Sequence, residues 1–203
     1  MTVYVETNFA LELALQQEQH DACRKILEIT TQGQVTLVVP AFSLTEPHSA
    51  IREKAKARNQ LAIQLESHLQ ELSRSKPNSS AITDFEAFRG LLAQSAESAR
   101  AGIRSVIMEL LQTAEVIPTD SQVLRLALEI ETEFEMLGQD AIVLASVLID
   151  LKSRLPERSC FFNRNTKDFD DPSVRSRLEA HGCKFFGRFD RGLNYLLSTL
   201  DRT

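Results

Sequence analysis

The sequence has 203 residues, which suffices for one domain with a full hydrophobic core or for one domain that carries a large insertion. A net charge of −5 argues against a protein that coats nucleic acid through bulk positive potential, but it leaves room for a nucleic-acid enzyme with local basic patches. The three cysteines form no CxxC pair, no apolar run is long enough to span a membrane, and the start lacks a signal-peptide pattern. We therefore expect a cytoplasmic protein that does not bind a membrane.

Five short apolar segments are predicted to be strands, and helices are predicted between them. The strands are expected at about 3–6, 35–39, 114–118, 160–163 and 183–186. Helices are expected at about 7–15, 18–30, 119–137, 139–151, 173–181 and 187–200. Strands that alternate with helices predict an α/β fold with a mainly parallel five-stranded sheet that helices cover on both faces.

The stretch between the second and third predicted strands is longer than a simple crossover needs. Apolar residues at spacings of three to four predict a helix over about 43–75, with Pro47 in its first turn. A polar segment around Pro77, residues 73–80, is predicted to be a loop, and Thr83 begins a capping-box pattern that predicts a second helix to about residue 112. We interpret residues 43–113 as a helical arm inserted into a single domain that spans residues 1–203.

Acidic or amide side chains occur at four places that follow a predicted strand or begin a predicted helix. Glu6 ends the first strand, and Glu46 follows the second strand by one helical turn. Asp140 stands at the start of a helix that is apolar nearly all round, and the polar segment 163–169 follows the fourth strand. The carboxyl ends of parallel strands are where α/β sheets place their ligands, so these side chains are candidates for one site.

Several carboxylates that converge at one edge of a sheet repel one another, and a divalent cation relieves this repulsion. A ligand set made only of oxygen atoms, without His or Cys, suits Mg²⁺ or Mn²⁺ rather than zinc. Such an ion lowers the pKa of a bound water and stabilises charge on a phosphodiester during in-line attack. The pattern therefore favours metal-dependent chemistry on a phosphate ester.

Four motifs along the chain, taken together and in order, resemble those of the PIN domain family. They are Glu6-Thr7-Asn8 after the first strand, Thr45-Glu46 after the second, Gly138-Gln139-Asp140-Ala141 before the apolar helix, and Asn163-Arg164-Asn165-Thr166-Lys167-Asp168-Phe169 after the fourth strand. The family includes the ribonuclease toxins of bacterial toxin–antitoxin pairs. The resemblance covers most of the chain apart from the helical arm, and it implies a three-layer α/β/α PIN-like fold.

The resemblance also implies roles for individual residues. Glu6, Glu46 and Asp140 would be the catalytic, metal-binding acids, and Asn165 and Asp168 would complete the ligands of Mg²⁺ or Mn²⁺. Thr7 and Asn8 would support the site, although Thr7 alone is interpreted as a plain helix N-cap. The first acid of the family is usually Asp, and the position of Asn165 is often Asp, so Glu6 and Asn165 depart from the pattern.

The function that the resemblance implies is a metal-dependent endoribonuclease, of the toxin type or otherwise, with RNA as its substrate. The alternative is a catalytically weak PIN-like binding or scaffold protein, which the departures at Glu6 and Asn165 favour. The candidates for contacting RNA are basic residues, and a solvated helix face is the competing interpretation for most of them: Arg52, Lys54, Lys56, Arg58 and Arg164. An antitoxin-like partner and a homodimer are further expectations.

Overall fold

The computed structural model describes residues 1–72, 74 and 79–201, and its centre is a five-stranded sheet. The strands are β1 (Thr2–Val5), β2 (Thr36–Pro40), β3 (Glu115–Ile117), β4 (Ser159–Phe162) and β5 (Cys183–Phe186). They lie in the order β3-β2-β1-β4-β5, and every pairing between neighbours is parallel. The predicted parallel sheet is confirmed, and β1 is its central strand.

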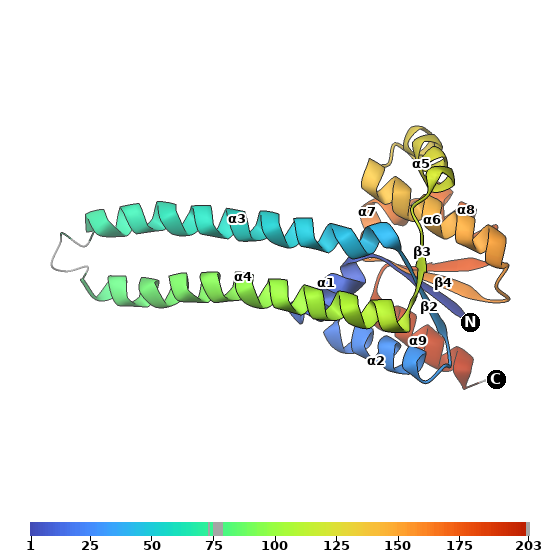
Figure 1. The fold of residues 1–203 in the computed structure, drawn as a ribbon, viewed down its shortest axis with the longest axis horizontal. Coiled ribbons are helices and arrows are strands. Elements are labelled where there is room, and N and C mark those ends of the chain that lie inside the picture. Colours follow the sequence, from blue (N-terminus) through green and yellow to red (C-terminus); the bar gives the residue numbers. More distant parts are fainter. Residues whose placement is uncertain (73, 75–78, 202–203) are drawn as a thin grey trace.

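Helices cover both faces of the sheet, which confirms the predicted three-layer architecture (Figure 1). One face packs against α1 (Thr7–Leu15), α2 (His20–Thr31) and α9 (Phe189–Leu200). The other face packs against α5 (Ser121–Phe134), α6 (Gly138–Arg154) and α8 (Pro172–Glu179). A short helix, α7 (Thr166–Phe169), follows β4 and was not predicted, because a single turn carries no helical periodicity.

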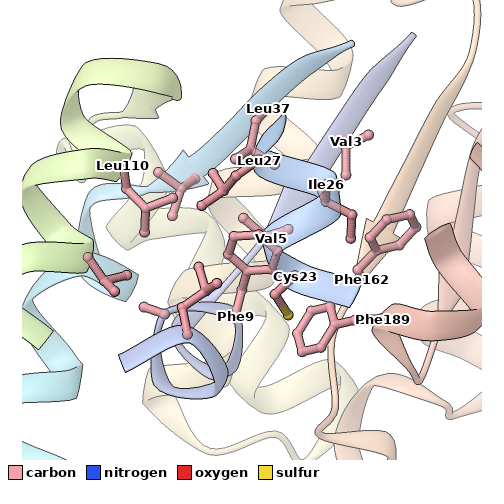
Figure 2. Close-up of a cluster of buried hydrophobic side chains, with 14 of the residues drawn as sticks. Val3, Val5, Phe9, Cys23, Ile26, Leu27, Leu37, Leu110, Phe162 and Phe189 are labelled. Carbon is pink, nitrogen blue, oxygen red and sulfur yellow. The ribbon is translucent and has the colours of Figure 1, made fainter. Parts of the chain in front are cut away.

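Alternation along β1 divides the buried side chains between two cores. Val3 and Val5 belong to the core on the side of α1, α2 and α9, where Phe9 and Phe189 meet edge to face (Figure 2). Tyr4 points to the opposite core, under α5, α6 and α8. Successive residues of a strand face opposite sides of the sheet, so a strand that is apolar throughout is buried on both faces. Because both faces of β1 are buried, its register in the sheet is fixed. The position of the residues that directly follow β1 is therefore fixed as well.

Two long helices, α3 (Ala41–Leu72) and α4 (Ser79–Thr113), form an antiparallel hairpin that extends well beyond the sheet (Figure 1). Because α3 begins directly after β2, Pro47 lies inside the helix, and its predicted place in the first turn is wrong. Proline has no N–H, so one helical hydrogen bond is lost there. The predicted helix start at Thr83 is also wrong, since α4 begins at Ser79. Of the predicted loop 73–80, residues 73 and 75–78 lie outside the described residues.

Other local signals agree with the structure. Asp120 is the N-cap of α5, where its carboxylate accepts hydrogen bonds from the backbone N–H groups of Gln122 and Val123 at 2.9 and 3.0 Å. This N-cap opens the helix that was predicted to begin at about residue 119. Among the described helices, none combines the length and the apolar composition that crossing a membrane requires.

Gly102 allows α4 to approach α1 closely. A Cβ atom at this position would lie 2.6 Å from the backbone oxygen of Ala14. We expect Gly102→Ala to lower the free energy of unfolding by about 1–3 kcal/mol, because two backbones would have to separate. Urea denaturation measures this effect. Gly90→Ala is the matched control, since nothing lies within 4 Å of its added Cβ; a gain of about 1 kcal/mol is expected there from helix propensity. Equal effects of the two substitutions would contradict the close approach.

Candidate active site

The predicted acids come together where the carboxyl ends of the strands meet the starts of three helices. Glu6 directly follows β1, Glu46 lies in the second turn of α3 after β2, and Asp140 lies in the first turn of α6. Asn165 is the N-cap residue of α7, the short helix after β4, and Asp168 lies within this helix. Parallel strands present these ends on one edge of the sheet, and the site therefore draws on four separate segments of the chain.

Glu6 is a buried carboxyl group with an oxygen atom that lacks a partner. Its side chain is 6% exposed, and no hydrogen bond to Oε1 is found within the described part of the protein. Burial raises the pKa of the Glu6 carboxyl from 4.5 to about 8; Asn8 opposes this increase through its backbone and side chain, and the charges of Glu46 and Asp140 add to it. An unpartnered buried carboxyl oxygen is costly to the fold, so it indicates a ligand at this position.

Thr7 and Glu46 connect the first two acidic segments. The hydroxyl of Thr7 donates a hydrogen bond to Oε2 of Glu46. Thr7 is the first residue of α1, and Glu6 occupies the N-cap position, so the interpretation of Thr7 as the N-cap is wrong. The side chain of Thr7 instead holds the carboxylate of Glu46, 39 residues further along the chain, beside the end of β1.

Asn165 connects the other two acids. Its Nδ2 donates to Oδ2 of Asp140 at 3.1 Å and to Oδ2 of Asp168 at 2.9 Å. Burial raises the pKa of Asp140 from 3.8 to about 6, Asn165 opposes the increase, and the charges of Asp168 and Glu46 add to it. An amide at position 165 thus separates two carboxylates that would otherwise repel each other directly. This contact explains how Asn is accommodated where the motif often has Asp.

The chemistry of this group of side chains fits a hard divalent cation. Its donors are oxygen atoms, one of them is the unpartnered Oε1 of Glu6, and mutual repulsion contributes to the raised pKa values of Glu6 and Asp140. Within the described residues, no three Asp, Glu, His or Cys side chains are grouped as the ligands of one metal ion. The donors are therefore chemically suited to a cation but are not arranged as a complete coordination shell.

Arg164 lies in an ion pair beneath the site, a role that the sequence did not indicate. Its guanidinium pairs with the carboxylate of Glu12 in α1, which is 1% exposed, and lies 3.6 Å from Oε2 of Glu18. The backbone N–H of Gln19 donates to the other oxygen of Glu12 at 2.8 Å. Arg164 therefore anchors the turn between β4 and α7 to α1. Its charge is already paired with carboxylates, which disfavours the predicted contact of Arg164 with RNA.

Sequence reasoning missed two residues that shape this turn. Glu12 is the single charged residue in the apolar run from Phe9 to Leu15, and a lone carboxylate in such a run was an available signal of a buried pair. Asn163 is 1% exposed, and its Oδ1 accepts a hydrogen bond from the backbone N–H of Asn165 at 2.7 Å. This bond fixes the position from which Asn165 reaches Asp140.

The other four basic residues that were predicted to contact RNA lie on α3. Arg52, Lys54, Lys56 and Arg58 are all exposed. Nε of Arg52 lies 3.9 Å from a carboxylate oxygen of Glu53, and Nη1 of Arg58 donates to Oγ of Ser95 in α4 at 3.0 Å. Arg52 and Lys56 lie on one side of the helix and Lys54 and Arg58 on another, because residues four apart share a face, so no single face carries all four.

Comparison with known proteins identifies the family. The sequence model of the PIN domain matches residues 3–169, a range that includes every predicted metal ligand and the hairpin of α3 and α4. The chain therefore belongs to the PIN domain family. Proteins of this family are typically nucleases and generally use divalent metal ions such as Mg²⁺. A comparison with curated proteins found no match.

Glu6→Gln is expected to stabilise the metal-free protein at pH 8 but not at pH 5. The raised pKa of Glu6 means that the folded state keeps a proton that the unfolded state releases between about pH 4.5 and pH 8, so wild-type stability falls over this window. Glutamine does not titrate, and the advantage of the variant should therefore grow to the order of a few kcal/mol by pH 8. Denaturation in EDTA at both pH values measures it.

The control for this experiment is Glu157→Gln, which changes an exposed carboxylate that precedes β4, at the opposite end of the strand from the predicted ligands. Its effect on the free energy of unfolding should stay within about 0.5 kcal/mol, the usual range for a surface substitution. A difference between Glu6→Gln and wild type that does not change with pH would contradict the buried, raised-pKa state of Glu6.

Proposed function

We propose that this protein is a metal-dependent ribonuclease that hydrolyses phosphodiester bonds in RNA. The observation that carries the proposal is the buried carboxyl of Glu6, whose Oε1 has no hydrogen-bond partner among the described residues and whose pKa is raised by burial and by the charges of Glu46 and Asp140. Structural acids are normally paired with cations or hydrogen-bond donors. A buried carboxyl oxygen that lacks such a partner, beside other acids, is typical of a site whose cation comes from solution.

Glu6, Glu46 and Asp140 would hold Mg²⁺ or Mn²⁺, with Asn165 and Asp168 beside them. When bound, the cation would activate a water molecule and stabilise the negative charge that develops on the phosphodiester. The supporting residues limit the rotation of the acids: Thr7 donates to Glu46, and Asn165 donates to Asp140 and to Asp168. These hydrogen bonds orient the carboxylates before a substrate arrives, which lowers the cost of organising the site during the reaction.

The proposal is tested with purified protein and a fluorescently labelled single-stranded RNA. We expect cleavage with Mn²⁺ or Mg²⁺ and none with EDTA, and the activity should co-elute with the protein during size-exclusion chromatography. Internal cleavage of an RNA blocked at both ends would support an endonuclease. Cleavage that persists in EDTA would overturn the proposal.

The second candidate function is a catalytically weak binding or scaffold protein. It is favoured by the neutral amide of Asn165 and by the absence of three grouped metal-ligating side chains among the described residues. Absence of cleavage for all RNAs tested, together with no heat of Mn²⁺ binding in calorimetry, would select this function. The toxin role, the antitoxin-like partner and the homodimer stay predictions, which co-purification and size-exclusion chromatography can test.

A further inference from the structure

A cavity of about 340 Å³ lies between α3 and α4, just beyond Glu46. It is lined by His48, Ser49, Ile51, Arg52, Arg100 and Ile103. Its volume is near the lower end of the range for ligand pockets, roughly 300–1,000 Å³. Its lining combines two arginines and a histidine, and none of the six lining residues is acidic. The cavity is therefore suited to an anionic group.

The cavity lies within two turns of Glu46 along α3 but on a different side of the helix. His48 and Ser49 follow Glu46 by two and three residues on α3, and Arg52 follows it by six. Six residues correspond to about 9 Å along a helix axis at about 1.5 Å per residue. At about 100° per residue, however, Arg52 and His48 lie about 120° and 160° around the axis from Glu46, so a strand held at the acidic site reaches the cavity by crossing over α3.

The cavity has an apolar floor and a cationic rim that two helices share. Ile51 and Ile103 are 4% and 1% exposed and belong, with Ala99, to one hydrophobic core cluster. Arg52 and Arg100 line the same cavity from opposite helices, although they are 48 positions apart in the sequence. Only the packing of the hairpin brings these two guanidinium groups together.

Both guanidinium groups are available to a ligand. Nε of Arg52 lies 3.9 Å from Glu53, and Nη1 of Arg100 lies 3.5 Å from Glu97; their side chains are 76% and 59% exposed. Ion pairs of such exposed side chains contribute about 0–1 kcal/mol, so a phosphate can displace them at little cost. Guanidinium groups bind phosphate through paired hydrogen bonds, which makes Arg the preferred residue for this anion.

We propose that this cavity binds a backbone phosphate of an RNA strand that crosses over α3 from the acidic site. The inference rests on the proposed function and adds a role for the helical arm in holding the substrate. The inference also distinguishes the basic residues of α3 by whether they line the cavity. Arg52 lines it and contacts the RNA, whereas Lys54 and Lys56 lie outside its lining. His48 and Arg100 join the RNA contacts, and neither had been predicted among them.

The test is RNA binding measured by fluorescence anisotropy with a labelled single-stranded oligonucleotide, in EDTA and in an Asp140→Asn background. We expect the double substitution Arg52→Gln and Arg100→Gln to weaken binding about tenfold, and to reduce the slope of log affinity against log salt by about 0.7 for one lost phosphate contact. The matched control is Lys54→Gln with Lys56→Gln, which removes the same charge from α3 outside the cavity. The control should change the affinity less than twofold.

The outcomes separate this inference from the proposed function. Equal weakening by the two double variants, unchanged binding by the Arg52 and Arg100 variant, or no RNA binding by the parent protein would each overturn the inference. If wild-type protein cleaves RNA while the arginine variant binds and cleaves normally, the inference fails and the proposed function stands. If the arginine variant alone loses binding while wild-type protein cleaves no RNA, the inference stands and the proposed function fails. Unchanged melting temperatures verify that the variants are folded.

Discussion

Asp140→Asn is expected to reduce RNA cleavage by roughly a hundredfold or more, because the bound cation supplies several kcal/mol of transition-state stabilisation and each 1.36 kcal/mol corresponds to a tenfold change in rate. Asparagine has the shape of aspartate and keeps an oxygen that can accept the hydrogen bond from Asn165. The substitution also removes a partly buried charge whose pKa is raised to about 6 by burial and by neighbouring acids. The melting temperature of the metal-free variant should therefore be unchanged or higher.

The measurement combines initial rates on labelled RNA with thermal unfolding. Asp170→Asn is the matched control: it is an exposed aspartate that pairs with Arg175 at 3.0 Å on the surface, and its loss should leave the rate unchanged. A variant at Asp140 that cleaves as fast as wild type would exclude this residue from the reaction. A large loss of melting temperature would instead assign Asp140 a structural role.

Arg164→Ala is expected to lower the free energy of unfolding by about 3–5 kcal/mol, the usual cost of removing one partner of a buried ion pair. Glu12, which is 1% exposed, would remain as a buried charge without its cation. For a chain of this length, each kcal/mol corresponds to about 2–4 °C in melting temperature, so the transition should move by roughly 6–20 °C. Thermal and urea denaturation report the change.

Two further variants show whether burial causes this effect. Arg177→Ala removes a surface arginine that pairs with Glu133 at 2.6 Å, and it should cost about 1 kcal/mol or less. Adding Glu12→Gln to Arg164→Ala should restore part of the lost stability, because no unpaired charge then stays buried. Similar losses for Arg164→Ala and Arg177→Ala would contradict the structural role given to the Glu12–Arg164 pair.

Strand and helix identities could be predicted from the sequence because they depend on local patterns. The apolar runs that become β1, β2 and β4 are buried on both faces of the sheet, and such runs stand out in the sequence whatever their neighbours are. The N-cap at Asp120 was predictable for the same reason, since its hydrogen bonds reach only two and three residues ahead. The errors at Pro47 and Thr83 arose where a local signal was compatible with more than one helix start.

The sequence by itself determined the order of the elements, the parallel sheet and the identities of the acids, because each depends on a short pattern in a known place along the chain. Only the tertiary structure decided which side chains meet. Thr7 contacts Glu46, which is 39 positions away, and Arg164 contacts Glu12, which is 152 positions away. Arg52 and Arg100, which line one cavity, are 48 positions apart. Such contacts follow from how buried surfaces pack, and no pattern within a single helix or strand specifies them.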